Sequence, residues 1–114
     1  MQRFRLPKYC LLRKNREFDA VYRQGKRLYC GDFGMVFLAN ERGYNRIGIS
    51  VSRKLKGAVV RNRIKRIFKE SFRLSRDIYP RHADIVITVR PDFSLNSPSH
   101  IDQAVVRLLC SKSV

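Results

Sequence analysis

The hydrophobic pattern is most regular in the middle of the chain, where apolar residues recur at three- and four-residue spacing. The positions concerned are Val60, Ile64, Ile67, Phe68 and Phe72. At about 100° per residue they form one stripe, which predicts an amphipathic helix whose other side faces solvent. A second stripe of this kind comprises Ile101, Ala104, Val105, Leu108 and Leu109. It predicts a last helix, and residues 98–102 are the segment that leads into it.

A shorter helix is predicted near the N-terminus, over about residues 16–24. Asn15 precedes this segment and is a favoured N-cap residue. Glu17 and Asp19 fall in the first turn, where the helix dipole favours acidic side chains. Gly25 follows the helix and is predicted to end it in the left-handed backbone conformation.

Phe18 and Tyr22 are i,i+4 neighbours on this first helix, so they share one face. The residues alone leave two interpretations open. The pair packs in the core, which is the commoner role of such pairs, or it forms a partly exposed platform on which unpaired bases stack.

Four β-strands are predicted from runs rich in β-branched and aromatic residues. They cover residues 26–30, 33–39, 46–52 and 84–90. The third strand has one apolar face and one face made only of small residues, namely Gly48, Ser50 and Ser52. A small-residue face lets something approach the sheet closely. An element of the same chain packs on such a face more often, and a ligand backbone is the alternative.

The predicted order of elements is α-β-β-β-α-β-α, which is typical of an α+β domain with one four-stranded sheet partly covered by helices. With 114 residues, of which 44% are hydrophobic, the chain is long enough for one domain with a real core. We assign residues 15–114 to a single α/β domain. Residues 1–14 form a basic N-terminal arm, in which Pro7 disfavours helix.

The charge of the chain indicates that this domain binds a polyanion. The net charge is +16, and residues 50–76 hold ten Lys or Arg side chains against the single acid Glu70. Like charges at i,i+4 spacing, such as Arg61 and Lys65, destabilise an isolated helix, so solubility alone does not explain this face. The pattern favours a nucleic acid as partner. Membrane binding is disfavoured because the apolar stripe is needed for the core and Trp is absent.

Catalytic chemistry is not indicated. Cys10, Cys30 and Cys110 form no C-x-x-C pair, so neither a disulfide framework nor a zinc site is predicted, and three free thiols fit a reducing cytoplasm. The two histidines and the acids are scattered singly, and no nucleophile elbow or phosphate-binding glycine loop occurs. We predict no catalytic residue, no metal site, no small-molecule substrate and no membrane segment. The basic helix follows a strand rather than another helix, which favours RNA over DNA.

The central stretch resembles the signature of the bacterial ribonuclease P protein component. The matching segments are Ser50-Val51-Ser52-Arg53-Lys54, Ala58-Val59, Arg61-Asn62-Arg63-Ile64-Lys65-Arg66 with Glu70, and, near the N-terminus, Leu12-Arg13-Lys14-Asn15-Arg16-Glu17-Phe18. Length, charge and element order agree as well. One departure is visible: Lys56 stands where the family often has glycine, and Gly57 directly precedes Ala58. The turn into the helix is therefore expected to be built differently.

The resemblance implies a role in a ribonucleoprotein endonuclease whose RNA subunit is the catalyst. That holoenzyme removes the 5′ leader of precursor tRNA with Mg²⁺ ions held mainly by RNA, and the protein chain itself is non-catalytic. The implied partners are the ribonuclease P RNA and precursor tRNA. The implied fold is an α/β sandwich with a left-handed β-α-β crossover, against the usual right-handed rule.

The resemblance also implies roles for individual residues and shifts Phe18 and Tyr22 toward partial exposure. The residues expected to contact the leader are Arg13, Lys14, Phe18, Tyr22, Arg90 and, as a weaker candidate, Phe33. Those expected to contact the catalytic RNA are Arg53, Lys54, Lys56, Arg61, Asn62, Arg63, Lys65, Arg66 and Lys69. A ribosomal or other structural RNA-binding protein of similar fold is the alternative. It explains the charge and the fold, but not the full central motif with Phe18 in register.

Overall fold

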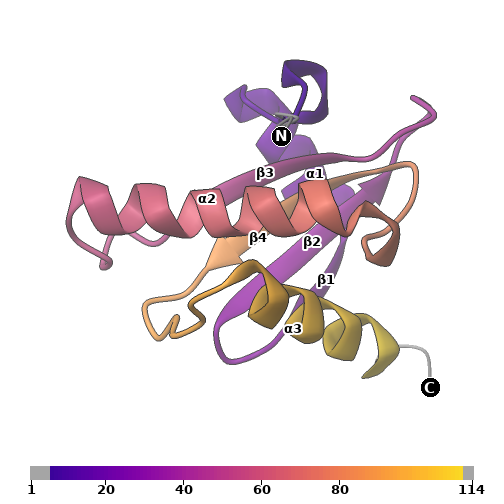
Figure 1. Cartoon of the computed structure of the whole chain (residues 1–114). Coiled ribbons are helices and arrows are strands. Elements are labelled where there is room, and N and C mark those ends of the chain that lie inside the picture. Colours follow the sequence, from indigo (N-terminus) through magenta and orange to yellow (C-terminus); the bar gives the residue numbers. More distant parts are fainter. Residues whose placement is uncertain (1–5, 112–114) are drawn as a thin grey trace.

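The computed structural model describes residues 6–111 and contains a four-stranded sheet with three α-helices (Figure 1). The elements in chain order are η1 (Lys8–Cys10), α1 (Asn15–Gln24), β1 (Lys26–Tyr29), β2 (Phe33–Ala39), β3 (Arg46–Val51), α2 (Ala58–Leu74), η2 (Arg76–Ile78), β4 (Ala83–Val89) and α3 (Pro98–Ser111). The predicted α-β-β-β-α-β-α order is confirmed. The two short 3₁₀ helices, η1 and η2, were not predicted because they are too short to show a period.

The strands lie in the order β1-β2-β4-β3. β1 pairs antiparallel with β2, β2 antiparallel with β4, and β3 parallel with β4. The parallel pair is connected by α2, which lies in front of the sheet in Figure 1. Both strands run from right to left in that view, and β4 lies below β3, so the crossover is left-handed as expected.

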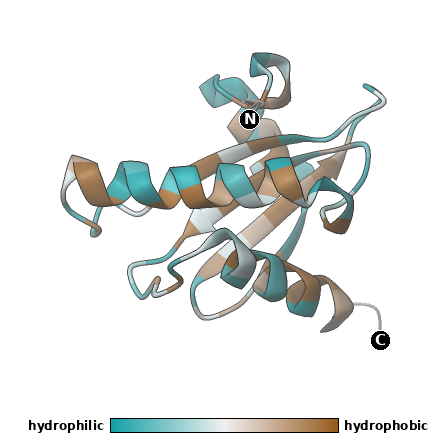
Figure 2. Cartoon of the chain, in the orientation of Figure 1, coloured by the Kyte–Doolittle hydropathy of each residue, from teal (hydrophilic) through white to brown (hydrophobic). Residues whose placement is uncertain are grey.

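The main core lies between the sheet and the pair α2 and α3. Ile85 and Ile87 of β4 face it from the sheet, Phe68 and Phe72 from α2, and Ile101 from α3. Figure 2 shows α2 alternating between hydrophobic and hydrophilic positions along its length, as the apolar stripe predicts. Val60 departs from the prediction and is 45% exposed, because the first turn of α2 extends beyond the sheet.

A buried polar cluster links α2 to α3 and η2. The Ser71 hydroxyl lies 2.7 Å from the Tyr79 hydroxyl and also donates to the Asp102 carboxylate, which accepts a second bond from the Ser75 hydroxyl at 2.8 Å. Burial raises the pKa of Tyr79 well above its ordinary value. The phenol therefore stays neutral, and the cluster fixes α3 against α2 without burying an unpaired polar group.

α1 covers part of the opposite face of the sheet, over a smaller cluster of Leu12, Val21, Val36 and Val86. Two details of its ends differ from the prediction. Lys14, not Asn15, is the N-cap residue, because the Glu17 carboxylate reaches back to the backbone N–H groups of Arg13 and Lys14. Gly25 has a φ of −81° rather than a left-handed one. Glycine is needed there because a Cβ would lie 2.6 Å from the Val21 carbonyl oxygen.

The described part of the N-terminal arm, residues 6–14, packs along the edge of the sheet. Leu11 forms a parallel bridge with Ile47, and the Leu12 N–H donates to the Ile47 oxygen at 2.8 Å. Cys10 and Leu12 are buried. The arm therefore covers the first half of the β3 edge and leaves the second half, toward Val51, beside the site described next.

Candidate nucleic-acid interface

The outward side of α2 carries basic and amide side chains, while Ile64, Ile67 and Phe68 occupy its buried side. Asn62, Arg63, Arg66 and Lys69 are exposed, and Lys65 and Arg73 lie partly buried beside them. Glu70 is the only acid in this helix and pairs with Arg73. The face therefore keeps the positive potential that the sequence predicts, which suits a polyanion.

The loop between β3 and α2 extends this basic surface, with Arg53, Lys54 and Lys56 exposed. Gly57, the N-cap residue of α2, has a φ of 95°, a conformation that glycine adopts without strain. Arg61 folds back over the loop, and its Nη1 donates to the Ser52 carbonyl at 2.8 Å and the Leu55 carbonyl at 3.4 Å. Arg61 thus holds the loop in place.

A cleft of about 640 Å³ lies between α1, the end of β3 and the start of α2. Its lining residues are Asn15, Phe18, Asp19, Tyr22, Ile49, Ser50, Val51, Ser52, Arg53, Arg61 and Lys65. One wall is aromatic and the opposite wall is basic. A single-stranded nucleic acid needs both, since its bases stack on rings and its phosphates attract cations.

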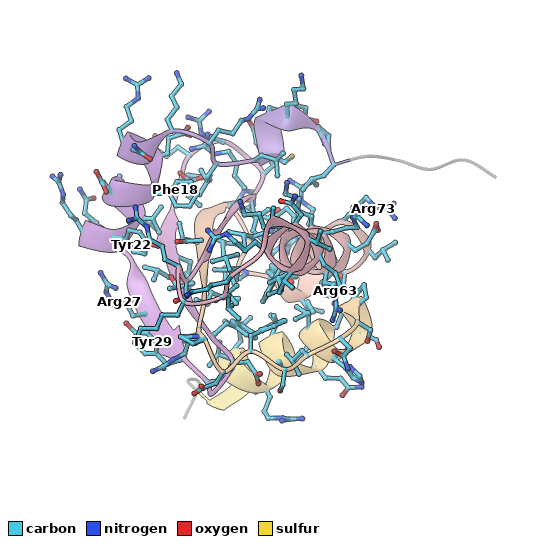
Figure 3. All side chains as sticks on the ribbon, turned by 90° about the vertical axis from the view of Figure 1, so that its left-hand side faces the viewer. Phe18, Tyr22, Arg27, Tyr29, Arg63 and Arg73 are labelled. Carbon is cyan, nitrogen blue, oxygen red and sulfur yellow. The ribbon has the colours of Figure 1, made fainter. Side chains whose placement is uncertain are left out.

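Phe18 and Tyr22 are each half-buried, so each ring packs partly within the fold and is partly exposed, and base stacking on them stays a prediction. The Phe18 ring packs on β3, where a Cβ at Gly48 would lie 2.6 Å from its Cζ. The small-residue face of β3 therefore receives an element of the same chain. The Tyr22 hydroxyl lies 3.4 Å from the Thr88 hydroxyl of β4. Both rings leave one side open to the cleft (Figure 3).

The other residues predicted to contact a leader lie at different places. Arg13 and Lys14 are exposed immediately before α1, and Arg90 is exposed immediately after β4. Phe33 is wholly buried and packs edge to face against Phe68, with ring centroids 5.1 Å apart. Its prediction as an exposed candidate is wrong, because its side chain points to the face of β2 that α2 and α3 cover.

A second basic groove, of about 850 Å³, separates the N-terminal segment from α2. It is lined by Leu6, Pro7, Lys8, Leu11, Asn62, Lys65, Arg66, Lys69, Glu70 and Arg73. Five of these ten residues are Lys or Arg. Sequence reasoning missed Lys8 as a site residue, because only the fold brings η1 alongside the basic helix.

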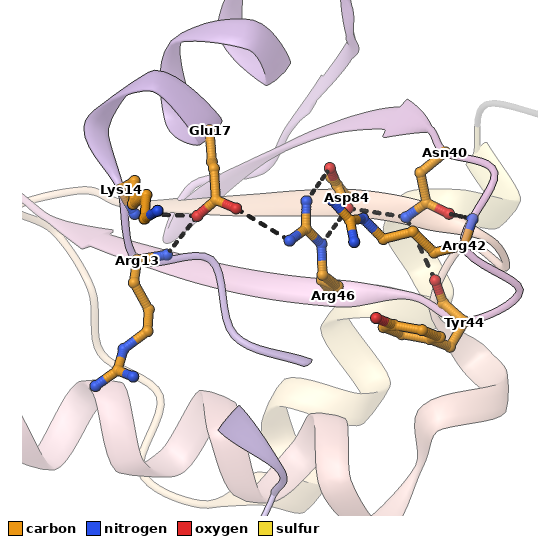
Figure 4. A network of polar contacts seen from close by, with 8 residues as sticks. All are labelled: Arg13, Lys14, Glu17, Asn40, Arg42, Tyr44, Arg46 and Asp84. Carbon is orange, nitrogen blue, oxygen red and sulfur yellow. Dashed lines mark hydrogen bonds and ion pairs between the residues drawn. The ribbon is translucent and has the colours of Figure 1, made fainter. Parts of the chain in front are cut away.

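A network of ion pairs fixes α1 to the sheet (Figure 4). Arg46, at the start of β3, lies between Glu17 of α1 at 3.0 Å and Asp84 of β4 at 2.8 Å. The Asn40 side-chain amide donates to Asp84 at 2.8 Å as well. No sequence pattern links these distant positions, so the network was not predicted. It sets the position of the α1 wall, on which Phe18 and Tyr22 lie.

The network also sets the ionisation of its acids. Burial acts to raise the pKa of Glu17, but hydrogen bonds from the Lys14 and Arg13 backbone and from Arg46 outweigh it and leave this pKa below its ordinary value. Asp84 follows the same pattern, with burial outweighed by its hydrogen bonds from Arg46 and Asn40. The pKa of Arg46 is raised, chiefly by its hydrogen bond with Asp84. All three groups therefore favour the charged state.

Between residues 6 and 111, no three His, Cys, Asp or Glu side chains gather as a metal site. Over the same residues, no helix is both long enough and apolar enough to cross a bilayer. The chemistry that the surface does offer is positive charge and aromatic stacking, on α2 and in the cleft.

Comparisons with known proteins identify the family of this chain. The sequence model of a family described as Ribonuclease P matches residues 6–112. A ribonuclease P protein component of Desulfotalea psychrophila is 59% identical over 105 residues, which are 92% of this chain and 88% of that protein. One of Alkaliphilus metalliredigens is 36% identical over 98 residues, covering 86% and 88%.

The solved structures that resemble this chain are also RNase P proteins. The RNase P protein of Staphylococcus aureus superposes with a TM-score of 0.76 at 28% identity, covering 92% of this chain and 96% of that one. The RNase P protein of Thermotoga maritima gives a TM-score of 0.68 at 29% identity, with 96% and 94% covered. Because the sequence match extends along nearly its whole length, this chain belongs to the ribonuclease P protein component family.

Proposed function

We propose that this chain is the protein subunit of a ribonuclease P holoenzyme and helps it remove the 5′ leader of precursor tRNA. Membership in the family supports a role in tRNA processing. The observation that carries the finer proposal is the cleft, where half-buried Phe18 and Tyr22 face Arg53, Arg61 and Lys65. This pairing of rings and cations fits an unpaired RNA strand better than a duplex.

The catalytic RNA is assigned to the outward face of α2 and the adjoining groove. Exposed Arg63, Arg66 and Lys69 offer a row of cations to a phosphate backbone, and Lys8 adds one from the other side of the groove. The exposed loop residues Arg53, Lys54 and Lys56 extend the row. Because this surface adjoins the cleft, one protein can contact the catalytic RNA and the leader at the same time.

The hydrolytic step belongs to the RNA subunit in this proposal. Mg²⁺ would be held mainly by RNA phosphates, since the described residues of the protein offer no cluster of ligands for it. The protein contributes binding. It holds the leader beside the catalytic RNA and so favours precursor tRNA, which has a leader, over mature tRNA, which lacks one.

A structural RNA-binding protein is the competing function, because charge and fold serve it equally well. The cleft favours the leader-binding role. A protein that only docks on folded RNA has no need of two aromatic rings open to solvent beside a strand edge.

Reconstitution tests the proposal. A precursor tRNA with a 5′ leader is incubated at low Mg²⁺ with a bacterial ribonuclease P RNA alone, with this protein alone, and with both. We expect cleavage at the mature 5′ end only with both components. Cleavage by the protein alone would reveal an active site in the protein, and tight RNA binding without stimulation would favour the structural role.

A further inference from the structure

The face of the sheet that carries α1 is only partly covered, and its outer strand β1 presents an exposed tyrosine there. Tyr29 pairs with Gly34 across the β1–β2 ladder, and Arg27 pairs with Val36. Since Val36 lies under α1, Arg27 and Tyr29 are on the same face of the sheet as α1. Tyr29 is 58% exposed, whereas the rings that face the main core, such as Phe33 and Phe68, are wholly buried.

Gly34 determines how the Tyr29 ring lies. A Cβ built on Gly34 would lie 2.9 Å from Cδ1 and 3.0 Å from Cε1 of Tyr29. The ring therefore rests on the bare backbone of β2, with one side against the sheet and the other open to solvent. A ring held in this way has already lost most of its rotational freedom, so stacking on it costs little further entropy.

Arg27 connects this ring with the cleft. Its guanidinium carbon lies 5.7 Å from the centre of the Tyr22 ring, and its Nη2 donates to the Tyr22 carbonyl oxygen. Figure 3 shows Phe18, Tyr22, Arg27 and Tyr29 following one another along one side of the molecule, away from α2. Tyr29 ends this row beside α3, where it lines a hollow together with His100 and Arg107. Aromatic rings with a cation between them form the kind of track on which single-stranded nucleic acid binds.

We propose that Tyr29 is a further base-stacking position for the leader, with Arg27 beside it as a contact for the phosphate backbone. This inference rests on the proposed function. The leader enters between α1 and β3, next to the surface assigned to the catalytic RNA, and continues toward β1 at the other edge of the sheet. Tyr29 therefore receives a nucleotide farther from the cleavage site than those held by Phe18 and Tyr22.

A purely structural role is the competing explanation, because an aromatic ring that covers a cross-strand glycine stabilises a hairpin. The two roles differ in what they do to leader dependence. A structural role affects stability and, through it, every substrate alike. A stacking role affects only substrates whose leader is long enough to reach β1.

The test measures the affinity of the reconstituted holoenzyme for precursor tRNAs whose unpaired leaders are shortened one nucleotide at a time. The variants are Tyr29→Ala, Tyr29→Phe and, as a matched control, Tyr9→Ala, which removes another exposed tyrosine outside this face. Phe18→Ala reports on the cleft itself. We expect Tyr29→Ala to bind long leaders about fivefold or more weakly. Short leaders should bind as they do to the unchanged protein, and Tyr29→Phe and Tyr9→Ala should match it throughout.

Equal affinity of Tyr29→Ala and the unchanged protein at every length would overturn the inference, as would an equal loss at every length accompanied by a lower melting temperature. In both cases, a length-dependent loss with Phe18→Ala would leave the proposed function intact. If the unchanged holoenzyme itself shows no dependence on leader length, the proposed function fails and this inference fails with it.

Discussion

Gly48 decides how closely α1 approaches the sheet. A side chain at this position would place its Cβ 2.6 Å from Cζ of Phe18 and 2.9 Å from Cβ of Leu12. Neither neighbour can retreat freely, since Leu12 is buried and Phe18 is held by its helix. The hydrogen atom of glycine thus lets Phe18 lie on β3 and still present one side to the cleft.

Replacing this glycine should therefore affect both the stability of the protein and its binding of the leader. We expect Gly48→Ala to lower the free energy of unfolding by about 1–3 kcal/mol, the usual effect of overpacking, and to weaken binding of precursor tRNA more than of mature tRNA. Gly31→Ala is the matched control, because a Cβ at Gly31 meets nothing within 4 Å. Chemical denaturation and holoenzyme binding measure the two effects. Equal stability of the two variants would contradict the close packing described here.

At the scale of the elements, α1 is attached to the sheet by charge as well as by packing. Its apolar contacts are few, with Val21 as its only fully buried residue. Arg46 adds ion pairs to Glu17 of α1 and Asp84 of β4. Breaking the network would leave Arg46, whose side chain is only 9% exposed, without its acidic partners.

This attachment should weaken in acid. The pKa values of Glu17 and Asp84 are lowered in the folded protein, so their contribution is complete above the unfolded values of about 4 and is lost as the pH falls through the folded ones. We expect the free energy of unfolding to fall as the pH drops below about 5. Glu17→Gln should make the protein less stable at pH 7, by about 1 kcal/mol, and should make that fall shallower. Denaturation followed from pH 7 to pH 3 measures both.

Glu41→Gln is the control for this experiment, since Glu41 is exposed and takes no part in the network. It should leave both the stability and its pH dependence unchanged. A Glu17→Gln protein with the unchanged pH profile would show that the network does not contribute in solution.

The elements themselves could be predicted from the sequence because their signals are local. The stripe from Ile64 to Phe72 and the alternation in β4 depend only on neighbouring residues. Partners distant in sequence could not be predicted. Nothing near Arg46 indicates that Glu17 and Asp84 will meet it, and nothing near Lys8 places it across a groove from α2.

For the aromatic residues, too, the sequence could not predict which side chains face the core and which face the site. Both faces of β2 are largely apolar, so the sequence did not indicate that Phe33 turns to the main core. For Phe18 and Tyr22 the sequence left burial and exposure open, because a ring can pack on a strand with one side and face a cleft with the other. Tyr29 was not singled out, since its significance depends on Gly34, which lies across the ladder.

At the scale of the whole molecule, the acids are arranged so that they leave the basic surface largely uncompensated. The net charge is +16, and several of the nine acids are engaged elsewhere. Glu17 and Asp84 pair with the buried Arg46, Asp102 accepts from Ser71 and Ser75, and Asp32 accepts from Ser94. Within α2 itself, Glu70 is the one acid among the cations, and the exposed cations of the helix remain available to phosphates.

The arginines of α2 should nevertheless differ from one another in a measurable way. Arg63 is exposed, and its Nη2 donates to the Asn96 side-chain oxygen at a long 3.3 Å, so it is available to a phosphate. Arg63→Ala should weaken binding to the catalytic RNA and reduce the log–log salt slope by about one, with the free energy of unfolding unchanged. Arg107→Ala, which removes an exposed arginine from α3, should change neither quantity.

Arg61 should respond in the opposite sense, because its guanidinium is occupied by the main-chain oxygens of Ser52 and Leu55. Arg61→Ala should lower the free energy of unfolding by about 1–3 kcal/mol and change the salt slope less than Arg63→Ala does. Titrations of protein with ribonuclease P RNA over a range of salt, paired with denaturation, separate the two effects. If Arg61→Ala reduced the slope by a full unit at unchanged stability, its hydrogen bonds to the loop would be exchanged for a phosphate on binding, and Arg61 would be a direct RNA contact.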